Sequence, residues 1–147
     1  MCDCPIRKWE EDRTIGMTPT EQHAAGIVCL VDDDASVLKS IQRLLASDGL
    51  AARAFGKPEE FLVYATAHHV AVVVLDIWME KVTGLEVLAR LCALSPKTRV
   101  IVITARDDLA ARATVTAIGP FAFFIKPFND EKFLAAVHNA LAQAAIS

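Results

Sequence analysis

The chain is predicted to be a single α/β domain with a doubly wound parallel sheet of five strands and five helices, and three observations lead to this prediction. Strand-sized apolar runs alternate about five times with segments of helical periodicity over the 147 residues. Several runs are apolar throughout, as expected for strands that helices cover on both faces. Polar residues follow four of the runs, where open parallel sheets form their binding sites.

The first half of the chain is expected to hold three strands and two helices. The strands span residues 27–31, 50–55 and 70–75, and a helix follows each of the first two. Asp34 or Ser36 can cap the first helix, and Gly49 ends it. Arg53 marks an edge strand, and Pro58 suits the first turn of the second helix. The expected inward side chains are Val37, Leu38, Ile41, Leu44, Leu45, Phe61, Leu62 and Ala65.

The second half is expected to hold two strands, 100–103 and 121–125, and three helices. The first of these helices starts at Gly84, and Asn129 can cap the last one. Their expected apolar stripes are Leu85, Leu88, Leu91 and Cys92, and Phe133, Leu134, Val137 and Leu141. The helix between them, residues 107–117, has a thin stripe of Leu109, Ala110, Ala113 and Ala117. That thin stripe makes it the expected mobile element.

Residues 1–26 show no apolar periodicity and are predicted to be a flexible leader ahead of a domain over residues 27–147. Met17 resembles a second start, and we hypothesise that translation naturally begins there. Deleting the first 16 residues should then leave solubility and activity unchanged.

Composition narrows the class of protein. The longest apolar runs are strand-sized, far short of the roughly 20 residues of a membrane helix, and no secretory signal is evident. Cys2-x-Cys4 lacks a second ligand pair, and Cys29 and Cys92 fall in predicted core elements. We therefore expect a soluble cytoplasmic protein without a membrane partner. The formal net charge is −3 without a basic block, which argues against nucleic-acid binding through this chain.

Groups that suit phosphate and metal follow four of the expected strands. Asp32 and Asp33 follow the first strand, Asp76 the third, Thr104 the fourth and Lys126 the fifth. Because the carboxyl ends of parallel strands share one edge of a sheet, these side chains are expected to lie together. Mg²⁺ prefers oxygen ligands and relieves repulsion between close carboxylates, so the pattern predicts a magnesium site.

Asp76 is the candidate acceptor of a phosphoryl group, because a carboxylate can attack phosphorus and form an acyl phosphate. Such a transfer depends mainly on positioning and charge neutralisation. Mg²⁺ and the Lys126 ammonium would neutralise the phosphoryl oxygens, and the Thr104 hydroxyl would hydrogen-bond to one of them. Each residue alone has a simpler explanation as a turn, a cap or a strand exit. All those explanations must hold at four strand ends for the site to be absent.

Four stretches in order resemble the receiver domain of response regulators, the CheY-like superfamily, over residues 27 to about 144. The stretches are Val31-Asp32-Asp33-Asp34, Leu75-Asp76-Ile77-Trp78-Met79 with Gly84, Ile103-Thr104-Ala105, and Phe123-Phe124-Ile125-Lys126-Pro127-Phe128. Each stretch is weak alone, whereas the four together at these separations are specific. The resemblance implies a flavodoxin-like sheet with strand order 2-1-3-4-5.

The resemblance also implies a role for each matching residue, with Asp76 as the phosphoacceptor and Mg²⁺ as the cofactor. The implied metal ligands are Asp32, Asp33, Asp76 and the backbone carbonyl of Trp78. The implied readers of the phosphate are Thr104, Lys126 and Phe123, the last of which would move with Thr104. The histidines at 23, 68, 69 and 138 have no ligand-spaced partners, so the phosphodonor histidine would belong to another protein.

Four residues depart from the family pattern. Glu80 stands where proline is usual, and Pro120 and Ala122 replace an alanine and an acidic residue. Trp78, two residues after the phosphoacceptor, is bulky for a position that faces incoming water. We therefore predict slow loss of the phosphoryl group, and faster loss in a Trp78→Asn variant.

The resemblance implies a switch of a two-component or phosphorelay pathway rather than an enzyme, one that at most assists its own phosphorylation and dephosphorylation. A sensor histidine kinase or a histidine-phosphotransfer protein would supply the phosphoryl group. The output would be contact with a downstream protein, with a phosphorylation-dependent homodimer as one form of it.

Two alternatives follow from the same residues. The Phe-Phe-Ile-Lys-Pro-Phe segment is similar to receivers that precede helix-turn-helix domains, as in LuxR-type regulators, so the chain can be the receiver of a longer DNA-binding regulator. An enzyme fits less well. A haloacid-dehalogenase-type phosphatase would need an aspartate where Trp78 stands, and three aspartates after the first strand would repel a flavin phosphate.

Overall fold

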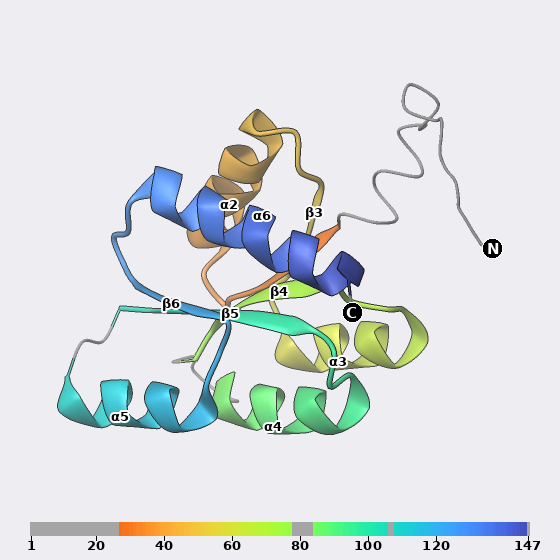
Figure 1. Ribbon diagram of the computed structural model, residues 1–147, viewed down its shortest axis with the longest axis vertical. Coiled ribbons are helices and arrows are strands. Elements are labelled where there is room, and N and C mark those ends of the chain that lie inside the picture. Colours follow the sequence, from red (N-terminus) through yellow and green to blue (C-terminus); the bar gives the residue numbers. More distant parts are fainter. Residues whose placement is uncertain (1–26, 78–83, 106–107, 147) are drawn as a thin grey trace.

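The computed structural model describes residues 27–77, 84–105 and 108–146, which form a parallel sheet between two layers of helices (Figure 1). The five strands lie in the order β3-β2-β4-β5-β6, and every neighbouring pair is parallel. Counted along the described chain, this order is 2-1-3-4-5, so the predicted doubly wound sheet is confirmed.

The elements alternate strand and helix along the chain. The strands are β2 (Val28–Val31), β3 (Ala52–Phe55), β4 (Val72–Asp76), β5 (Arg99–Thr104) and β6 (Ala122–Ile125). The helices are α2 (Ala35–Ser47), α3 (Pro58–Ala67), α4 (Gly84–Leu94), α5 (Leu109–Ile118) and α6 (Asp130–Ile146). β3 and β6 form the two edges of the sheet, and Arg53 on β3 is exposed as expected for an edge strand.

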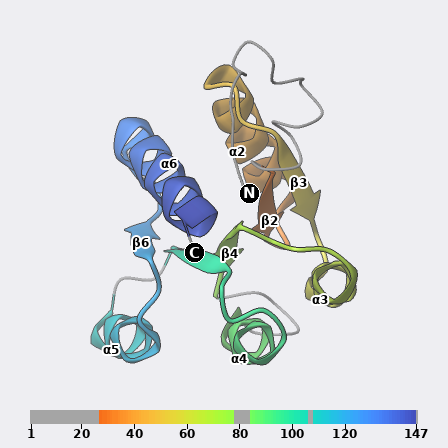
Figure 2. The ribbon, with the colours of Figure 1, turned by 45° about the vertical axis from the view of Figure 1, so that its right-hand side comes forward.

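Two apolar cores lie on opposite faces of the sheet because successive strand residues point to opposite sides. Figure 2 shows α2 and α6 over one face, with α3, α4 and α5 over the other. Val28 and Leu30 of β2 belong to the core under α2 and α6. Cys29 and Val31 belong to the core against the other three helices. The continuous apolar runs of the sequence therefore reflect strands that are covered twice.

The predicted helix ends are largely confirmed. Asp34 rather than Ser36 caps α2, since its side chain accepts hydrogen bonds from the backbone N–H groups of Ser36 and Val37. Gly49 follows the end of α2 with a φ of 76°, a conformation that glycine adopts without strain. Asn129 Oδ1 accepts a hydrogen bond from the Lys132 backbone N–H at 2.9 Å, as expected of the residue before α6.

The predicted stripe of the helix over residues 107–117 is wrong. Leu109 is 86% exposed, and Ala110, Ala113 and Ala117 are exposed as well. Val115 is the buried apolar residue of α5 among those whose side chains are described. The alanines carry too little apolar surface to select the inward face, whereas Val115, two positions from Ala113 and from Ala117, is buried.

Several sequence-based expectations lie outside the described residues. They are the leader of residues 1–26, the start at Met17, the Trp78 carbonyl and the substitution at Glu80. The side chains of Leu85 and Cys92 are likewise not described, whereas Cys29 is buried in the core as expected. Among the described helices, none combines the length and apolar character needed to cross a membrane.

Candidate functional site

The predicted site residues stand at the carboxyl ends of four neighbouring strands. Asp32 directly follows β2, Asp76 is the last residue of β4, Thr104 is the last residue of β5, and Lys126 directly follows β6. Val31 is in register with Leu75, so Asp32 and Asp76 come level on adjacent strands. Strand register therefore brings Asp32 and Asp76 together, and the long Lys126 side chain reaches Asp32 from two strands further across the sheet, 94 positions later in the sequence.

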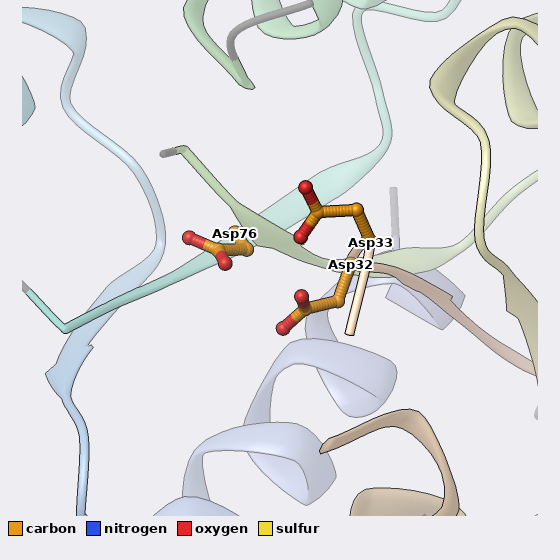
Figure 3. A group of neighbouring side chains, drawn as sticks. All are labelled: Asp32, Asp33 and Asp76. Atoms are coloured by element: carbon orange, nitrogen blue, oxygen red, sulfur yellow. The ribbon is translucent and has the colours of Figure 1, made fainter. Parts of the chain in front are cut away.

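Three carboxylates gather at this edge of the sheet. One oxygen each of Asp32, Asp33 and Asp76 lies within 4.8 Å of the other two. Figure 3 shows the side chains of Asp32 and Asp33 extending toward Asp76. Asp32 is 1% exposed and Asp76 is 5% exposed, whereas Asp33 is exposed to solvent. Two oxygen donors are thus held inside the domain, and a third stands at the rim.

The Lys126 ammonium links the two buried carboxylates. Its Nζ donates to Asp32 Oδ2 at 3.0 Å and to Asp76 Oδ2 at 3.2 Å. Burial lowers the pKa of Lys126, but the hydrogen bond with Asp32 and the charges of Asp76 and Asp32 outweigh that effect, so the pKa is raised overall. The side chain therefore carries a positive charge at the site throughout the neutral pH range.

Hydrogen bonds from backbone N–H groups orient the same residues. The sequence pattern did not predict these bonds. The Asp34 backbone N–H donates to Asp32 Oδ1 at 3.0 Å, so the turn into α2 holds that carboxylate. The Asp32 N–H donates to the Phe55 carbonyl of β3, and the Lys126 N–H donates to the Thr104 carbonyl at 2.8 Å. No residue-type signal marks the two bonds between backbone groups, whereas the bond to the Asp32 carboxylate is of a kind that aspartate commonly makes in turns.

Thr104 and Phe123 lie on one face of the sheet. Thr104 is fully buried, and Phe123 packs partly buried against the core that α3, α4 and α5 cover. Phe123 is in register with Val102, which is two residues before Thr104 on β5. Because side chains two apart on a strand share a face, Thr104 and Phe123 are neighbours on the side of α5.

The donor set suits a small divalent cation. Mg²⁺ takes oxygen ligands and keeps several waters, so two or three carboxylates are sufficient protein ligands. A cation would also reduce the repulsion between carboxylates that lie this close. The described residues thus form an acidic cluster that could hold a metal ion, and its chemistry fits the predicted magnesium site. The predicted ligand at Trp78 lies outside the part of the chain described here.

Comparison with known proteins places this geometry in a family. The model of the response regulator receiver domain matches residues 28–138. The transcriptional regulatory protein TdiR of Thauera aromatica is 35% identical over 126 residues, which are 86% of this chain and 56% of that protein. The chain spans about half the length of the curated relatives it matches, 52% in the case of the response regulator protein TmoT of Ectopseudomonas mendocina.

Solved structures show the same fold. A response regulator receiver protein from Burkholderia phymatum is 41% identical with a TM-score of 0.71, and the match covers 80% of this chain and 95% of that one. A response regulator protein from Burkholderia pseudomallei, solved with a phosphorylated aspartic acid, a calcium ion and citrate, is 26% identical with a TM-score of 0.69. That match covers 82% of this chain and 71% of the other. The chain belongs to the response regulator receiver domain family of two-component signalling proteins.

Proposed function

We propose that Asp76 is the phosphoacceptor of this receiver domain and that Asp32, Asp33 and Asp76 bind Mg²⁺. The observation that carries the proposal is the position of the Asp76 carboxylate. It is buried at the carboxyl end of the central strand β4, within hydrogen-bond distance of the Lys126 ammonium and beside two further carboxylates. This is the arrangement that phosphoryl transfer to a carboxylate needs, because positioning and charge neutralisation supply most of the rate.

The donor would be a phosphohistidine of a sensor kinase or of a histidine-phosphotransfer protein. An Asp76 oxygen forms the new bond to phosphorus while the bond from phosphorus to the imidazole nitrogen breaks. The phosphohistidine ring carries a proton on its other nitrogen, so the bonding electrons stay on the ring and neutral imidazole leaves. Bound Mg²⁺ would supply positive charge to the phosphoryl oxygens during this transfer. Lys126 adds a second positive charge, and its bond to Asp32 keeps the ammonium directed at the acid site.

One related structure supports the assignment. The Burkholderia pseudomallei response regulator is described with a phosphorylated aspartic acid and a calcium ion, and it shares the fold of this chain. An acyl phosphate and a divalent cation therefore occur together in that related protein. Mg²⁺ and Ca²⁺ share a preference for oxygen ligands, and the compact cluster with a water-accessible Asp33 suits the smaller ion.

The phosphoryl group would signal through Thr104 and Phe123. A hydroxyl that hydrogen-bonds to the new phosphoryl oxygens draws Thr104 toward the site, and Phe123 on the same face moves into the space it leaves. The helix beside them, α5, exposes Leu109 and buries Val115 as its apolar anchor among the described side chains. Because Leu109 and the described alanines of α5 are exposed, this helix is the element proposed to shift. A downstream protein, or a second copy of the chain, would recognise the shifted surface.

The test is chemical phosphorylation with a small donor. Wild type, Asp76→Asn and Asp48→Asn are incubated with acetyl phosphate and MgCl2 and weighed by mass spectrometry. We expect wild type and Asp48→Asn to gain one phosphoryl group, and Asp76→Asn to gain none. Replacing MgCl2 with EDTA should abolish the gain. Phosphorylation of Asp76→Asn, or a gain that is independent of Mg²⁺, would refute the proposal.

A second candidate function is that of a receiver within a longer transcriptional regulator. The observation that favours it is the partial coverage of TdiR, which is named as a transcriptional regulatory protein and of which this chain spans 56%. A gel-shift assay with a longer gene product would decide it, because DNA binding by that product alone would assign the output to a further domain. The cytoplasmic location stays a prediction.

A further inference from the structure

We propose that three phenylalanine rings act together as positioning residues for the Lys126 ammonium. The rings belong to Phe124 and Phe128, which flank Lys126 two residues on either side, and to Phe133 of α6. We name this group the aromatic clasp. The inference rests on the proposed function, since it assigns a task to residues behind the lysine of that site.

The two flanking rings converge on one buried ring. Phe124 packs edge-on against Phe133 with ring centroids 5.7 Å apart. Phe128 stacks on Phe133 with centroids 4.8 Å apart and an interplanar angle of 27°. Phe124 and Phe128 also contact each other at 5.8 Å. Phe133 is fully buried, whereas the two flanking rings are half-buried. The chain on both sides of Lys126 is thus attached to the first turns of α6.

The chain beyond Lys126 has little support on its other side. A hollow of about 340 Å³ separates Lys126, Pro127 and Phe128 from the residues of α2 that face them, namely Ser36, Val37, Ser40 and Ile41. Before Lys126, the strand β6 and the hydrogen bond to the Thr104 carbonyl hold the backbone. After it, Phe128 stacks on Phe133 and contacts Phe124, and Asn129 caps α6.

The position of the backbone matters because the Lys126 side chain is long and flexible. A lysine ammonium on a free backbone samples many rotamers, and fixing its origin restricts where the charge can lie. Its hydrogen bonds to Asp32 and Asp76, at 3.0 and 3.2 Å, leave little room for displacement before they are lost. A shift of about 1 Å at a positioned group can slow a reaction by up to about a hundredfold.

The experiment measures two properties of each variant: the rate of phosphorylation by acetyl phosphate at saturating MgCl2, and the Mg²⁺ affinity from an NMR titration. Phe128→Leu keeps an apolar side chain but removes the stacked ring. We expect its rate to fall by about three- to tenfold, with no loss of Mg²⁺ affinity because the three carboxylates stay in place. Phe128→Tyr should restore the rate, since the ring remains and its hydroxyl can reach solvent from a half-buried position.

Val137→Ala is the matched control, because Val137 is buried on α6, as Phe133 is, but is not one of the three rings of the clasp. It should lower stability and leave the rate unchanged. In a Lys126→Ala background, Phe128→Leu should have no further effect on the rate, as expected for residues that act through one another. The clasp would be overturned if Phe128→Leu phosphorylated at the wild-type rate, or if it lost Mg²⁺ affinity along with rate. It would also be overturned if Phe128→Leu lowered the rate in the Lys126→Ala background as much as it does in wild type.

The same variants separate this inference from the function it rests on. A wild type that takes up no phosphoryl group would refute the proposed function, and the clasp is then decided by urea unfolding. Phe128→Leu and Lys126→Ala should destabilise the chain non-additively if the ring holds the lysine in its ion pairs. Additive losses would overturn the clasp whatever the outcome with acetyl phosphate.

Discussion

At the scale of single residues, the charge on Lys126 and the burial of its two partners belong together. Asp32 and Asp76 lie inside the domain, and the ammonium donates to one oxygen of each. A buried carboxylate is costly unless it is hydrogen-bonded and paired with an opposite charge, and the ammonium supplies both to Asp32 and Asp76. Although burial lowers the pKa of Lys126 in part, the same hydrogen bonds and charges raise it overall.

Lys126→Ala should therefore lower the free energy of unfolding, by about 1–3 kcal/mol, when EDTA is present. MgCl2 should recover part of that loss, because the cation binds more tightly where no ammonium competes for the carboxylates. Urea unfolding in EDTA and in MgCl2 measures both effects, with Lys132→Ala, an exposed residue on α6, as the control. A loss of the same size under both conditions would contradict the shared role of cation and lysine.

Cys29, which lies in the core that α3, α4 and α5 cover, gives a prediction that depends on pH. Burial raises the pKa of its thiol from 9.0 to about 11, and the charge of Arg53 opposes the rise only in part. The neutral thiol is thus favoured in the folded chain, so its contribution is complete below pH 9 and is lost as pH rises toward 11. Wild type should lose about 2 kcal/mol more than Cys29→Ala between about pH 8 and 10.5. Urea unfolding in a reducing buffer checks this, and parallel pH curves for the two proteins would contradict it.

At the scale of elements, the helix caps were predictable and the strand starts were not. Asp34 and Asn129 cap helices as expected, because short polar side chains bond to nearby backbone N–H groups. The strand expected over 70–75 instead spans Val72–Asp76, since Val70 and Ala71 lie in the approach to it. Val70 is buried and Ala71 half-buried although neither belongs to the strand, and an apolar run predicts burial rather than strand pairing. For the same reason the alanine-rich stripe of α5 was misplaced.

The cap of α2 allows a test at this scale. Asp34 Oδ1 accepts hydrogen bonds from the N–H groups of Ser36 at 2.9 Å and Val37 at 3.4 Å. Asp34→Ala should cost about 1 kcal/mol in the free energy of unfolding, because both donors lose their acceptor at the helix start. Asp34→Ser, which can still cap, should retain most of the stability. Equal losses in the two variants, measured by urea unfolding, would show that the cap contributes nothing.

At the scale of the whole molecule, the acid site was predictable because strand ends in a parallel sheet meet at one edge. In the sequence, Asp32, Asp76 and Lys126 stand at the ends of apolar runs, and the parallel sheet places these strand ends at one edge. Contacts between helices carry no such signal. His138 of α6 and Asp48 at the end of α2 pair at 2.6 Å across 90 residues of sequence. The contacts of the aromatic clasp with Phe133 of α6 carry no sequence signal either.

Metal binding is the property that joins these scales, and it should stabilise the folded chain as a whole. The three carboxylates come together only when the sheet has formed, so Mg²⁺ held by them would favour the folded state and shift the unfolding equilibrium. At a concentration ten times its dissociation constant, the cation should add about 1.4 kcal/mol to the free energy of unfolding. This would raise the melting temperature by about 5 °C. Differential scanning calorimetry in MgCl2, with NaCl at equal ionic strength as the reference, measures the shift.

The variant that isolates the metal is Asp33→Asn. Asp33 is exposed, so its replacement leaves the core intact while it removes one of the three clustered carboxylates. This variant should lose most of the Mg²⁺-dependent rise in melting temperature, whereas Asp48→Asn, at a surface position remote from the strand ends, should keep it. An equal rise in both variants would mean that Mg²⁺ acts on the general surface charge, because only a cation held at the strand ends distinguishes Asp33 from Asp48.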